Sequence, residues 1–184
     1  PYALKVISKE KVRKLNQCPQ QANQKENHDF NTNQSGKAMT DSIFFAETVI
    51  SPLLLHKNLV KTVECVETNK AFFQFMDLCT DGNLLDVLCD NDQKVNFSQR
   101  IKYLTQIIDA IEYLHENFIC HRDIKLENIL IHKGSAKLCD FGFCALCTGT
   151  ESHQTVSGKC GTVQYVAPEV LKQESYDGRA ADMW

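Results

Sequence analysis

The stretch that decides the fold is His121-Arg122-Asp123-Ile124-Lys125-Leu126-Glu127-Asn128, followed by Asp140-Phe141-Gly142 and then by Ala167-Pro168-Glu169. The first stretch places an acid, Asp123, five residues before an amide, Asn128. Carboxylate and amide oxygens are the hard ligands that Mg²⁺ prefers, and a carboxylate can also act as a general base. The three motifs together therefore predict a site that combines a metal ion with a base.

This ordered set resembles the signature of protein kinases. The resemblance implies an α+β, bilobal fold with a small β-rich lobe and a larger, mainly helical lobe. It also implies that Asp123 accepts the proton of a substrate hydroxyl, and that Asn128 and Asp140 bind the Mg²⁺ that bridges the phosphates of ATP. ATP and Mg²⁺ are therefore the expected cofactors, and proteins bearing Ser or Thr hydroxyls are the expected partners.

Two further residues extend the resemblance around Asp123. Lys125 is the residue type that serine/threonine kinases have two positions after the catalytic acid. Thr162 resembles the threonine that bridges Asp123 and Lys125 in that class. Stretches such as YVAPEVL at 165–171 are similar to the calcium/calmodulin-dependent-kinase-like group. The resemblance thus implies catalytic roles for Lys125 and Thr162, and contact of Lys125 with the nucleotide.

The beginning of the chain also resembles a kinase element. Tyr2-Ala3-Leu4-Lys5 is similar to the V-A-I-K strand, whose lysine holds the ATP phosphates and pairs with a glutamate on the next helix. Glu47 is the predicted partner of Lys5, because it lies nine residues before His56-Lys57-Asn58-Leu59-Val60, which resembles the stretch after that helix. We therefore expect Lys5 and Glu47 to form an ion pair at the nucleotide.

The end of the Glu47 helix departs from the family. Pro52 lacks an N–H, so the helix should kink or stop near Ser51. Ser51 and Thr62 also stand about where the family stacks apolar residues. Either Glu47 is one position out of register, or this helix is held loosely.

The adenine site is predicted from the strand that precedes the hinge. Met76 resembles the gatekeeper residue, and Asp77 to Cys79 would offer backbone groups to adenine. Ala3 and Leu130 would lie above and below the ring. These residues complete the expected nucleotide pocket.

Two elements should support the catalytic loop. An amphipathic helix with an N-cap is predicted from Ser98 onward, because apolar residues recur at helical spacing. Asn128 to His132 and Ala136 to Cys139 predict a hairpin that turns at Lys133-Gly134-Ser135 and returns Asp140 beside Asn128. The residues of the apolar helix face are Ile101, Leu104, Ile107, Ile108, Ile111 and Leu114.

The resemblance predicts one partial kinase domain over 1–184. A partial small lobe spans 1–78, a hinge spans 77–82, and a partial large lobe spans 83–184. An Asn- and Gln-rich insert at about 12–40 is too polar to fold and reads as a disordered loop, either a tolerated surface insertion or a docking segment. The eight glycines never take the G-x-G-x-x-G spacing, so the fragment alone is expected to be inactive.

Composition narrows the classes of partner. With 43% hydrophobic and 23% charged residues the chain suits a globular domain, and its net charge of −3 gives no electrostatic case for binding nucleic acid. No apolar run is long enough for a membrane segment. We expect a cytoplasmic or nuclear protein.

The nine cysteines are expected to be reduced thiols rather than a disulfide scaffold. Cys144 and Cys147 form a lone C-x-x-C with no second pair, which does not predict a zinc site. Cys139, just before Asp140, should face the nucleotide pocket. There it would either react slowly with ATP-site electrophiles or pack without reacting.

Two other functions fit part of the pattern. Small-molecule kinases of the aminoglycoside type share an H-x-D loop, but they lack the segment from Asp140 to Glu169 seen here. A pseudokinase scaffold without catalysis would share the fold. Mg-ATP binding by the full-length protein would separate an enzyme from such a scaffold.

The activation segment lacks the usual threonine. Gly158 occupies the position, two residues before Cys160, where the family generally has its phosphorylated residue. Arg122 nevertheless precedes the catalytic acid and resembles an arginine that binds such a phosphate. Ser157 is therefore the predicted site for an upstream activating kinase, with Thr155 the next nearest. A segment ordered without any phosphate is the alternative.

Overall fold

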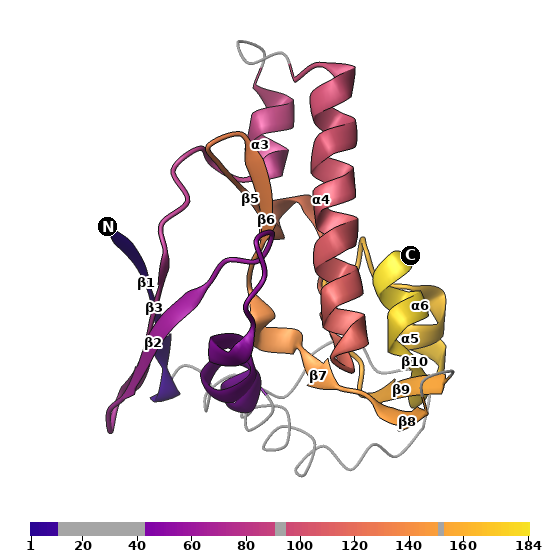
Figure 1. Cartoon of the computed structure of the whole chain (residues 1–184). Coiled ribbons are helices and arrows are strands. Elements are labelled where there is room, and N and C mark those ends of the chain that lie inside the picture. The colour runs from indigo at the N-terminus through magenta and orange to yellow at the C-terminus, as the bar shows by residue number, and fades with distance from the viewer. Residues whose placement is uncertain (11–42, 91–94, 151–152) are drawn as a thin grey trace, which may run out of the picture.

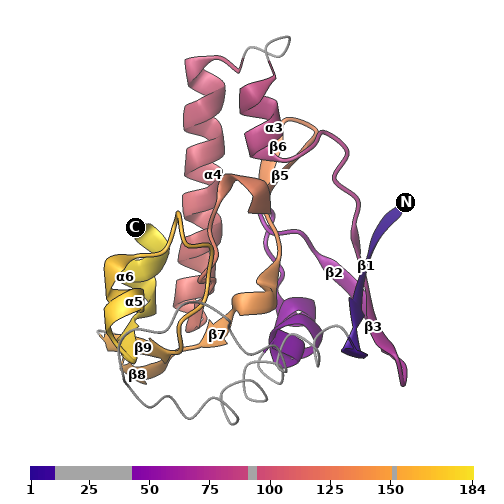
Figure 2. The same cartoon turned by 180° about the vertical axis from the view of Figure 1, so that it is seen from behind.

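The computed structural model describes residues 1–10, 43–90, 95–150 and 153–184 (Figure 1). The insert predicted at about 12–40 lies outside these residues, so its expected disorder stays a prediction. The described chain separates a three-stranded sheet from a mainly helical part, with a β-hairpin between them. Figure 2 shows the same separation from behind. This segregation of strands and helices agrees with the predicted α+β class.

The sheet carries Lys5. Its antiparallel strands lie in the order β1-β3-β2, and Lys5 of β1 is paired with Gln74 of β3. Along β1, Tyr2, Leu4 and Val6 are exposed whereas Ala3 and Lys5 are less so. Successive side chains of β1 therefore point to opposite faces of the sheet, as in a regular strand. The strands are β1 (Tyr2–Ser8), β2 (Thr62–Glu67) and β3 (Ala71–Asp77).

The helix that carries Glu47 changes its hydrogen-bond pattern before Pro52. It passes through a π-helical segment, η1 (Ala46–Ile50), into a short 3₁₀-helix, η2 (Ser51–Leu53). The amide of Ser51 donates to the carbonyl of Ala46, five residues back. Pro52 has no N–H to continue an α-helical ladder, and of the predicted kink or stop near Ser51 the structure shows a change of helix type there, with the helix ending at Leu53.

The long helix α4 (Phe97–Glu116) lies beside α3 (Leu84–Cys89). Its start was predicted at Ser98, but the N-cap is Asn96. Asn96 accepts from the Gln99 amide at 2.9 Å and Gln99 returns the bond, a capping box that outcompetes the single serine hydroxyl. Toward the C-terminal end of α4, three residues of the predicted apolar face are buried: Ile107, Ile111 and Leu114.

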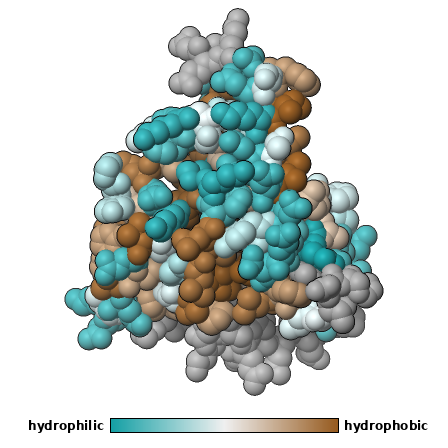
Figure 3. All heavy atoms as spheres, in the orientation of Figure 1, coloured by the Kyte–Doolittle hydropathy of each residue, from teal (hydrophilic) through white to brown (hydrophobic). Residues whose placement is uncertain are grey.

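Part of the apolar face of α4 is exposed. Ile101, Leu104 and Ile108 are each more than two fifths exposed. Figure 3 shows hydrophobic surface along this edge of the molecule. The buried half of the helix packs on the hairpin and on Phe141, which fixes the position of the catalytic loop.

The hairpin joins β5 (Ile129–His132) to β6 (Ser135–Leu138). Its turn has two residues, Lys133 and Gly134, rather than the three predicted, because Ser135 already pairs with His132. Both turn residues have positive φ, 52° and 68°, as a type I′ turn requires. The expected return of Asp140 beside Asn128 is confirmed, since the Cys139 amide donates to the Asn128 carbonyl at 2.9 Å.

The catalytic loop and the segment after it are tied to a second small core. Phe118, the residue before the strand Ile119–Cys120, has φ 58°. None of the helices among the described residues is both long and apolar enough to cross a membrane. The remaining elements are β4 (Ile119–Cys120), η3 (Leu126–Asn128), η4 (Phe141–Phe143), β7 (Ala145–Leu146), β8 (Thr148–Thr150), β9 (His153–Ser157), α5 (Pro168–Lys172), β10 (Ser175–Asp177) and α6 (Gly178–Met183).

Candidate active site

Hydrogen bonds to the Asp182 carboxylate hold the loop that carries Asp123. The backbone amides of His121 and Arg122 donate to the Asp182 carboxylate at 2.9 and 2.7 Å. Arg122 has φ 66°, a backbone conformation that is strained for a residue with a side chain. Asp182 itself is buried and also contacts His115 at 2.8 Å. The buried carboxylate therefore compensates the strain that turns the loop toward the cleft.

Asp123 is surrounded by donors. Its Oδ1 accepts from the Thr162 hydroxyl at 2.7 Å and from the Thr162 amide at 2.9 Å. Its Oδ2 lies 2.8 Å from Lys125 Nζ and accepts from Asn128 Nδ2 at 2.9 Å. Lys125 in turn donates to the Thr162 hydroxyl at 2.7 Å. The bridge that the sequence predicted between Asp123, Thr162 and Lys125 is thus present.

This environment keeps Asp123 ionised. Burial alone would raise the pKa of its carboxyl, but the hydrogen bonds from Lys125 and Thr162 outweigh it and lower that pKa below its usual value. Burial would likewise lower the pKa of Lys125, yet the adjacent Asp123 carboxylate raises it. Both groups are therefore charged at neutral pH, and the carboxylate can accept a proton that an approaching group releases.

The two predicted metal ligands lie at the ends of the hairpin. Asn128 donates through Nδ2 to the carbonyl oxygen of Asp123 at 2.8 Å, so its side-chain oxygen is the atom left to bind a cation. Asp140 has φ 63° and a side chain that is 47% exposed. Although burial would raise the pKa of Asp140, the nearby Lys5 ammonium lowers it. One neutral and one charged oxygen ligand are a donor set that suits Mg²⁺.

Lys5 bridges two carboxylates. Its Nζ lies 2.5 Å from Glu47 Oε1 and 2.7 Å from Asp140 Oδ1, so the predicted ion pair is present. Burial would lower the pKa of Lys5, but the charges of Glu47 and Asp140 raise it. Burial of Glu47, which is 2% exposed, raises the pKa of its carboxyl. A side chain at Gly142 would place its Cβ 3.0 Å from Glu47 Oε1, which explains the glycine.

One pocket collects the predicted nucleotide contacts between the sheet and the hairpin. The strand pairing explains the arrangement, since Ala3 lies opposite Met76 across β1 and β3. Leu130 of β5 also lines this pocket. Of the predicted nucleotide-binding residues only Lys125 does not line this pocket. The lining includes Ala3, Lys5, Glu47, Met76, Asp77, Cys79, Asn128, Leu130 and Asp140.

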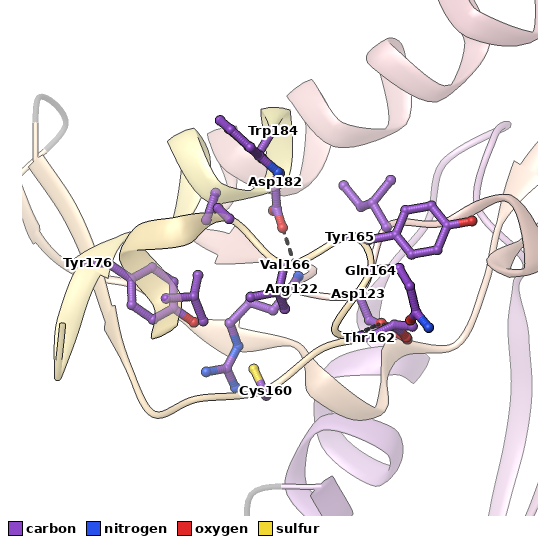
Figure 4. Close-up of a pocket in the computed structure, with 14 residues that line it drawn as sticks. Arg122, Asp123, Cys160, Thr162, Gln164, Tyr165, Val166, Tyr176, Asp182 and Trp184 are labelled. Carbon is purple, nitrogen blue, oxygen red and sulfur yellow. Dashed lines mark hydrogen bonds between the residues drawn. The ribbon is translucent and has the colours of Figure 1, made fainter. Parts of the chain in front are cut away.

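Asp123 lines a different pocket (Figure 4). Thr162, Gln164 and Tyr165 of the segment after β9 lie beside Asp123, and Arg122 and Asp182 also line the pocket. Asn128, which bonds to Asp123, lines the nucleotide pocket. The carboxylate therefore stands between two pockets, one on each side of the catalytic loop.

Sequence reasoning missed two residues that shape this site. Asp182 lies outside the motifs from which the site was predicted, and its contacts with the loop span 60 and 61 residues of sequence, which no local pattern predicts. Gln74 was not singled out, although it lines the nucleotide pocket and is buried. A glutamine within an apolar strand was the available signal.

The comparisons with known proteins agree with this geometry. The model of the protein kinase domain family matches residues 1–184. The chain is 32% identical over its whole length to "CBL-interacting protein kinase 31" of Oryza sativa subsp. japonica and to "CBL-interacting serine/threonine-protein kinase 3" of Arabidopsis thaliana, covering 36% of each. It is 37% identical to "CBL-interacting serine/threonine-protein kinase 17" of Arabidopsis thaliana over 72% of the chain and 31% of that protein. The chain spans about a third of the length of these relatives, and it belongs to the protein kinase domain family.

Proposed function

We propose that the protein containing this chain transfers the γ-phosphoryl group of Mg-ATP to serine and threonine hydroxyls of protein substrates. The observation that carries the proposal is the ionised Asp123 carboxylate, fixed by Thr162, Lys125 and Asn128 at the boundary of two pockets. Serine/threonine kinases among the relatives support the class of acceptor. A pseudokinase scaffold is less well supported, because Asp123, Asn128, Asp140 and the Lys5–Glu47 ion pair keep an arrangement that phosphoryl transfer could use.

The residues suggest how the reaction proceeds. A substrate hydroxyl approaching from the pocket beside Thr162 and Tyr165 would meet Asp123, which accepts its proton as the oxygen attacks the γ-phosphorus. Asn128 and Asp140 would hold Mg²⁺, which neutralises phosphate charge when bound. Lys5 would hold the phosphates from the opposite side, and Lys125 would offset negative charge near the transferred group. Positioning and charge account for nearly all of the catalysis in this reaction class.

The first test removes the base and a metal ligand separately. In the full-length protein, Asp123→Asn and Asp140→Asn should each lower phosphate transfer to serine or threonine peptides, the former by roughly 10²- to 10⁴-fold. The first change removes the proton acceptor, and the second removes a carboxylate ligand. Only the second should therefore weaken Mg²⁺ binding, which is measured as a higher Mg²⁺ concentration at half-maximal transfer. Transfer is measured with labelled ATP, and circular dichroism checks the fold.

Asp109→Asn is the matched control, because Asp109 lies on α4 and, within the described part of the chain, forms an ion pair with the exposed Lys57 at 3.3 Å. It should leave turnover unchanged. Near-normal turnover in both active-site variants, or wild-type protein that neither binds Mg-ATP nor phosphorylates peptides, would favour the scaffold. Preference for tyrosine peptides would contradict the acceptor class.

Cys139 offers a test of the nucleotide pocket. Its thiol lines the pocket, but burial raises its pKa to about 12, so little thiolate exists at neutral pH. We expect iodoacetamide at neutral pH to label the exposed Cys89 and to leave Cys139 unmodified, as read by peptide mass spectrometry. Labelling of Cys139 at a rate similar to that of Cys89, and its protection by Mg-ATP, would instead support the reactive alternative.

Regulation by phosphorylation of Ser157 is also a proposal. Arg122 donates to the carbonyl oxygens of Phe143 at 2.7 Å and of Ser157 at 2.9 Å, and Ser157 is exposed. A phosphate on Ser157 would therefore lie within reach of the Arg122 guanidinium. An upstream kinase acting on Ser157 would strengthen a link between the catalytic loop and β9 that already exists through the backbone.

Ser157→Ala should lower the activity of protein isolated in its phosphorylated form, because the added charge of about −1.5 to −2 is lost. Ser175→Ala is the control, since Ser175 is exposed and pairs with Ser157 on the neighbouring strand. Activity is measured alongside phosphopeptide mapping. Undiminished activity of Ser157→Ala, with no phosphate between Thr148 and Thr162, would show that the backbone contacts suffice.

A further inference from the structure

Three polar side chains are buried together between the sheet and the end of the Glu47 helix. Gln74 Nε2 donates to Ser51 Oγ at 3.0 Å and to Thr62 Oγ1 at 2.9 Å, and the two hydroxyls are 2.6 Å apart. Ser51, Thr62 and Gln74 are 0%, 4% and 2% exposed. We call these three residues the polar cluster. They form a closed ring of hydrogen bonds that joins η2, β2 and β3.

The polar cluster is not the most stable filling of this space. Gln74 Oε1 is buried and has no hydrogen-bond partner among the described residues. A buried acceptor without a partner loses its hydration and gains nothing in return. Apolar side chains of similar size would avoid this loss. The polar cluster therefore provides directional hydrogen bonds, but it stabilises the fold less than apolar side chains of similar size would.

The position of these bonds relates them to the ion pair. Gln74 lies directly opposite Lys5 across β1 and β3, and Ser51 follows Glu47 by four residues on the same buried face of the helix. The contact from Gln74 to Ser51 therefore lies beside the contact from Lys5 to Glu47, and both join the three-stranded sheet to the helix that carries Glu47. Each is a link from the sheet to the helix.

The helix needs such a link because its own backbone is weak there. The segment from Ala46 to Ile50 is π-helical, and Pro52 supplies no N–H to the turn that follows. The main chain around Glu47 therefore does not fix the helix in the way that a regular α-helical ladder would. Side-chain bonds from β2 and β3 to Ser51 fix it instead.

We propose that Gln74, Ser51 and Thr62 are positioning residues that hold Glu47 against Lys5, an inference that rests on the proposed function for its catalytic consequence. None of the three needs to touch the nucleotide phosphates. Their effect passes through the placement of the helix, and it is largest on the handling of ATP. The reaction at Asp123, on the far side of the hairpin, depends on them only indirectly.

Gln74→Leu in the full-length protein tests this directly. It removes the amide and its unpartnered oxygen together, so the melting temperature should stay equal or rise while the KM for ATP rises about tenfold, a coupling typical of contacting residues. If Gln74 served stability alone, Gln74→Leu would lower the melting temperature as well as raise the KM for ATP. In a Glu47→Gln variant, Gln74→Leu should raise the KM for ATP no further, because the carboxylate that the polar cluster positions is already absent.

Cys65 provides a readout that does not need catalysis. Its Sγ lies 3.6 Å from the Glu47 carbonyl oxygen and is partly exposed. Movement of the helix should therefore speed alkylation of Cys65 in Gln74→Leu and, should that variant not fold, in Ser51→Ala. If wild type transfers no phosphate but Cys65 still reacts faster in these variants, the proposed function fails and the positioning role stands.

Asn58→Leu is the matched control. Asn58 is another buried amide whose oxygen has no partner among the described residues, but it bonds to the Ala136 carbonyl of the hairpin at 2.9 Å. It should leave the alkylation rate of Cys65 unchanged. An unchanged rate in Gln74→Leu as well, or effects of Gln74→Leu and Glu47→Gln that simply multiply, would overturn the proposal.

A separate observation concerns two thiols behind the catalytic loop. Cys120 ends β4 and is fully buried, and Cys147 follows β7 and is partly exposed. Their sulfurs are 2.9 Å apart, and the Cys147 amide donates to the Phe118 carbonyl at 2.7 Å. A disulfide bond of about 2.05 Å needs only a small further approach of the two sulfurs.

We infer that Cys120 and Cys147 are a site of reversible disulfide formation by peroxide. The Cys147 thiolate attacks hydrogen peroxide, breaking its O–O bond to give a sulfenic acid and hydroxide. The Cys120 sulfur then attacks the sulfenic sulfur, forming the S–S bond and releasing water with the Cys120 proton. A hydrogen bond from Cys120 lowers the pKa of Cys147, which favours Cys147 as the attacking thiol. The bond would tie the activation segment to the strand that enters the catalytic loop.

Peptide mapping of the full-length protein after peroxide treatment is the test. We expect a peptide pair linked through Cys120 and Cys147, lighter by two hydrogens and separated again by dithiothreitol. Cys147→Ser should abolish it, whereas Cys89→Ser, at an exposed cysteine elsewhere, should not. A sulfinic acid on Cys147 with no linkage, or a linkage of either residue to another cysteine, would overturn the inference.

Discussion

The buried carboxylate of Asp182 is the constraint on which the site depends. It accepts the amides of two consecutive residues, His121 and Arg122, at the point where Arg122 has positive φ. Without this acceptor, the buried N–H of His121 and the partly buried N–H of Arg122 would lack partners, and the strained turn would have no compensation. The orientation of Asp123 follows from that turn. An acid near the end of the described chain thus sets the geometry of a base some sixty residues before it.

The two sides of the cleft are fixed by different means. On the side of the large helix, apolar packing of Leu114, Phe141 and Leu138 holds the hairpin. On the side of the sheet, the helix with Glu47 is held by Lys5 and by the polar cluster. Apolar packing does not depend on direction, whereas hydrogen bonds and ion pairs do. The sheet side is therefore the part whose placement is set by a few specific contacts.

Sequence reasoning predicted those parts of the site that lie on short motifs. Asp123, Lys125 and Asn128 share one loop, and the hairpin after Asn128 needed only its turn residues to bring Asp140 back. The partner of Lys5 was also predicted correctly, although Pro52 made the register uncertain. Spacing and turn residues were enough for the hairpin, whereas the roles of the loop residues and the pairing of Lys5 with Glu47 followed from the resemblance to protein kinases.

What the sequence did not predict depends on competition between local and distant contacts. Ser98 looked like a helix cap, but Asn96 with Gln99 satisfies two amides where a serine hydroxyl satisfies one. The π-helical turn before Pro52 and the ring of Ser51, Thr62 and Gln74 arise only when three elements meet. The same polar residues that made the Glu47 helix look loosely held are the ones that bind it to the sheet. Polar residues at positions where an apolar pattern is expected can therefore indicate a specific hydrogen bond rather than a weak contact. The hydrogen bond is recognised by the burial of the polar side chains against one another, as in Ser51, Thr62 and Gln74.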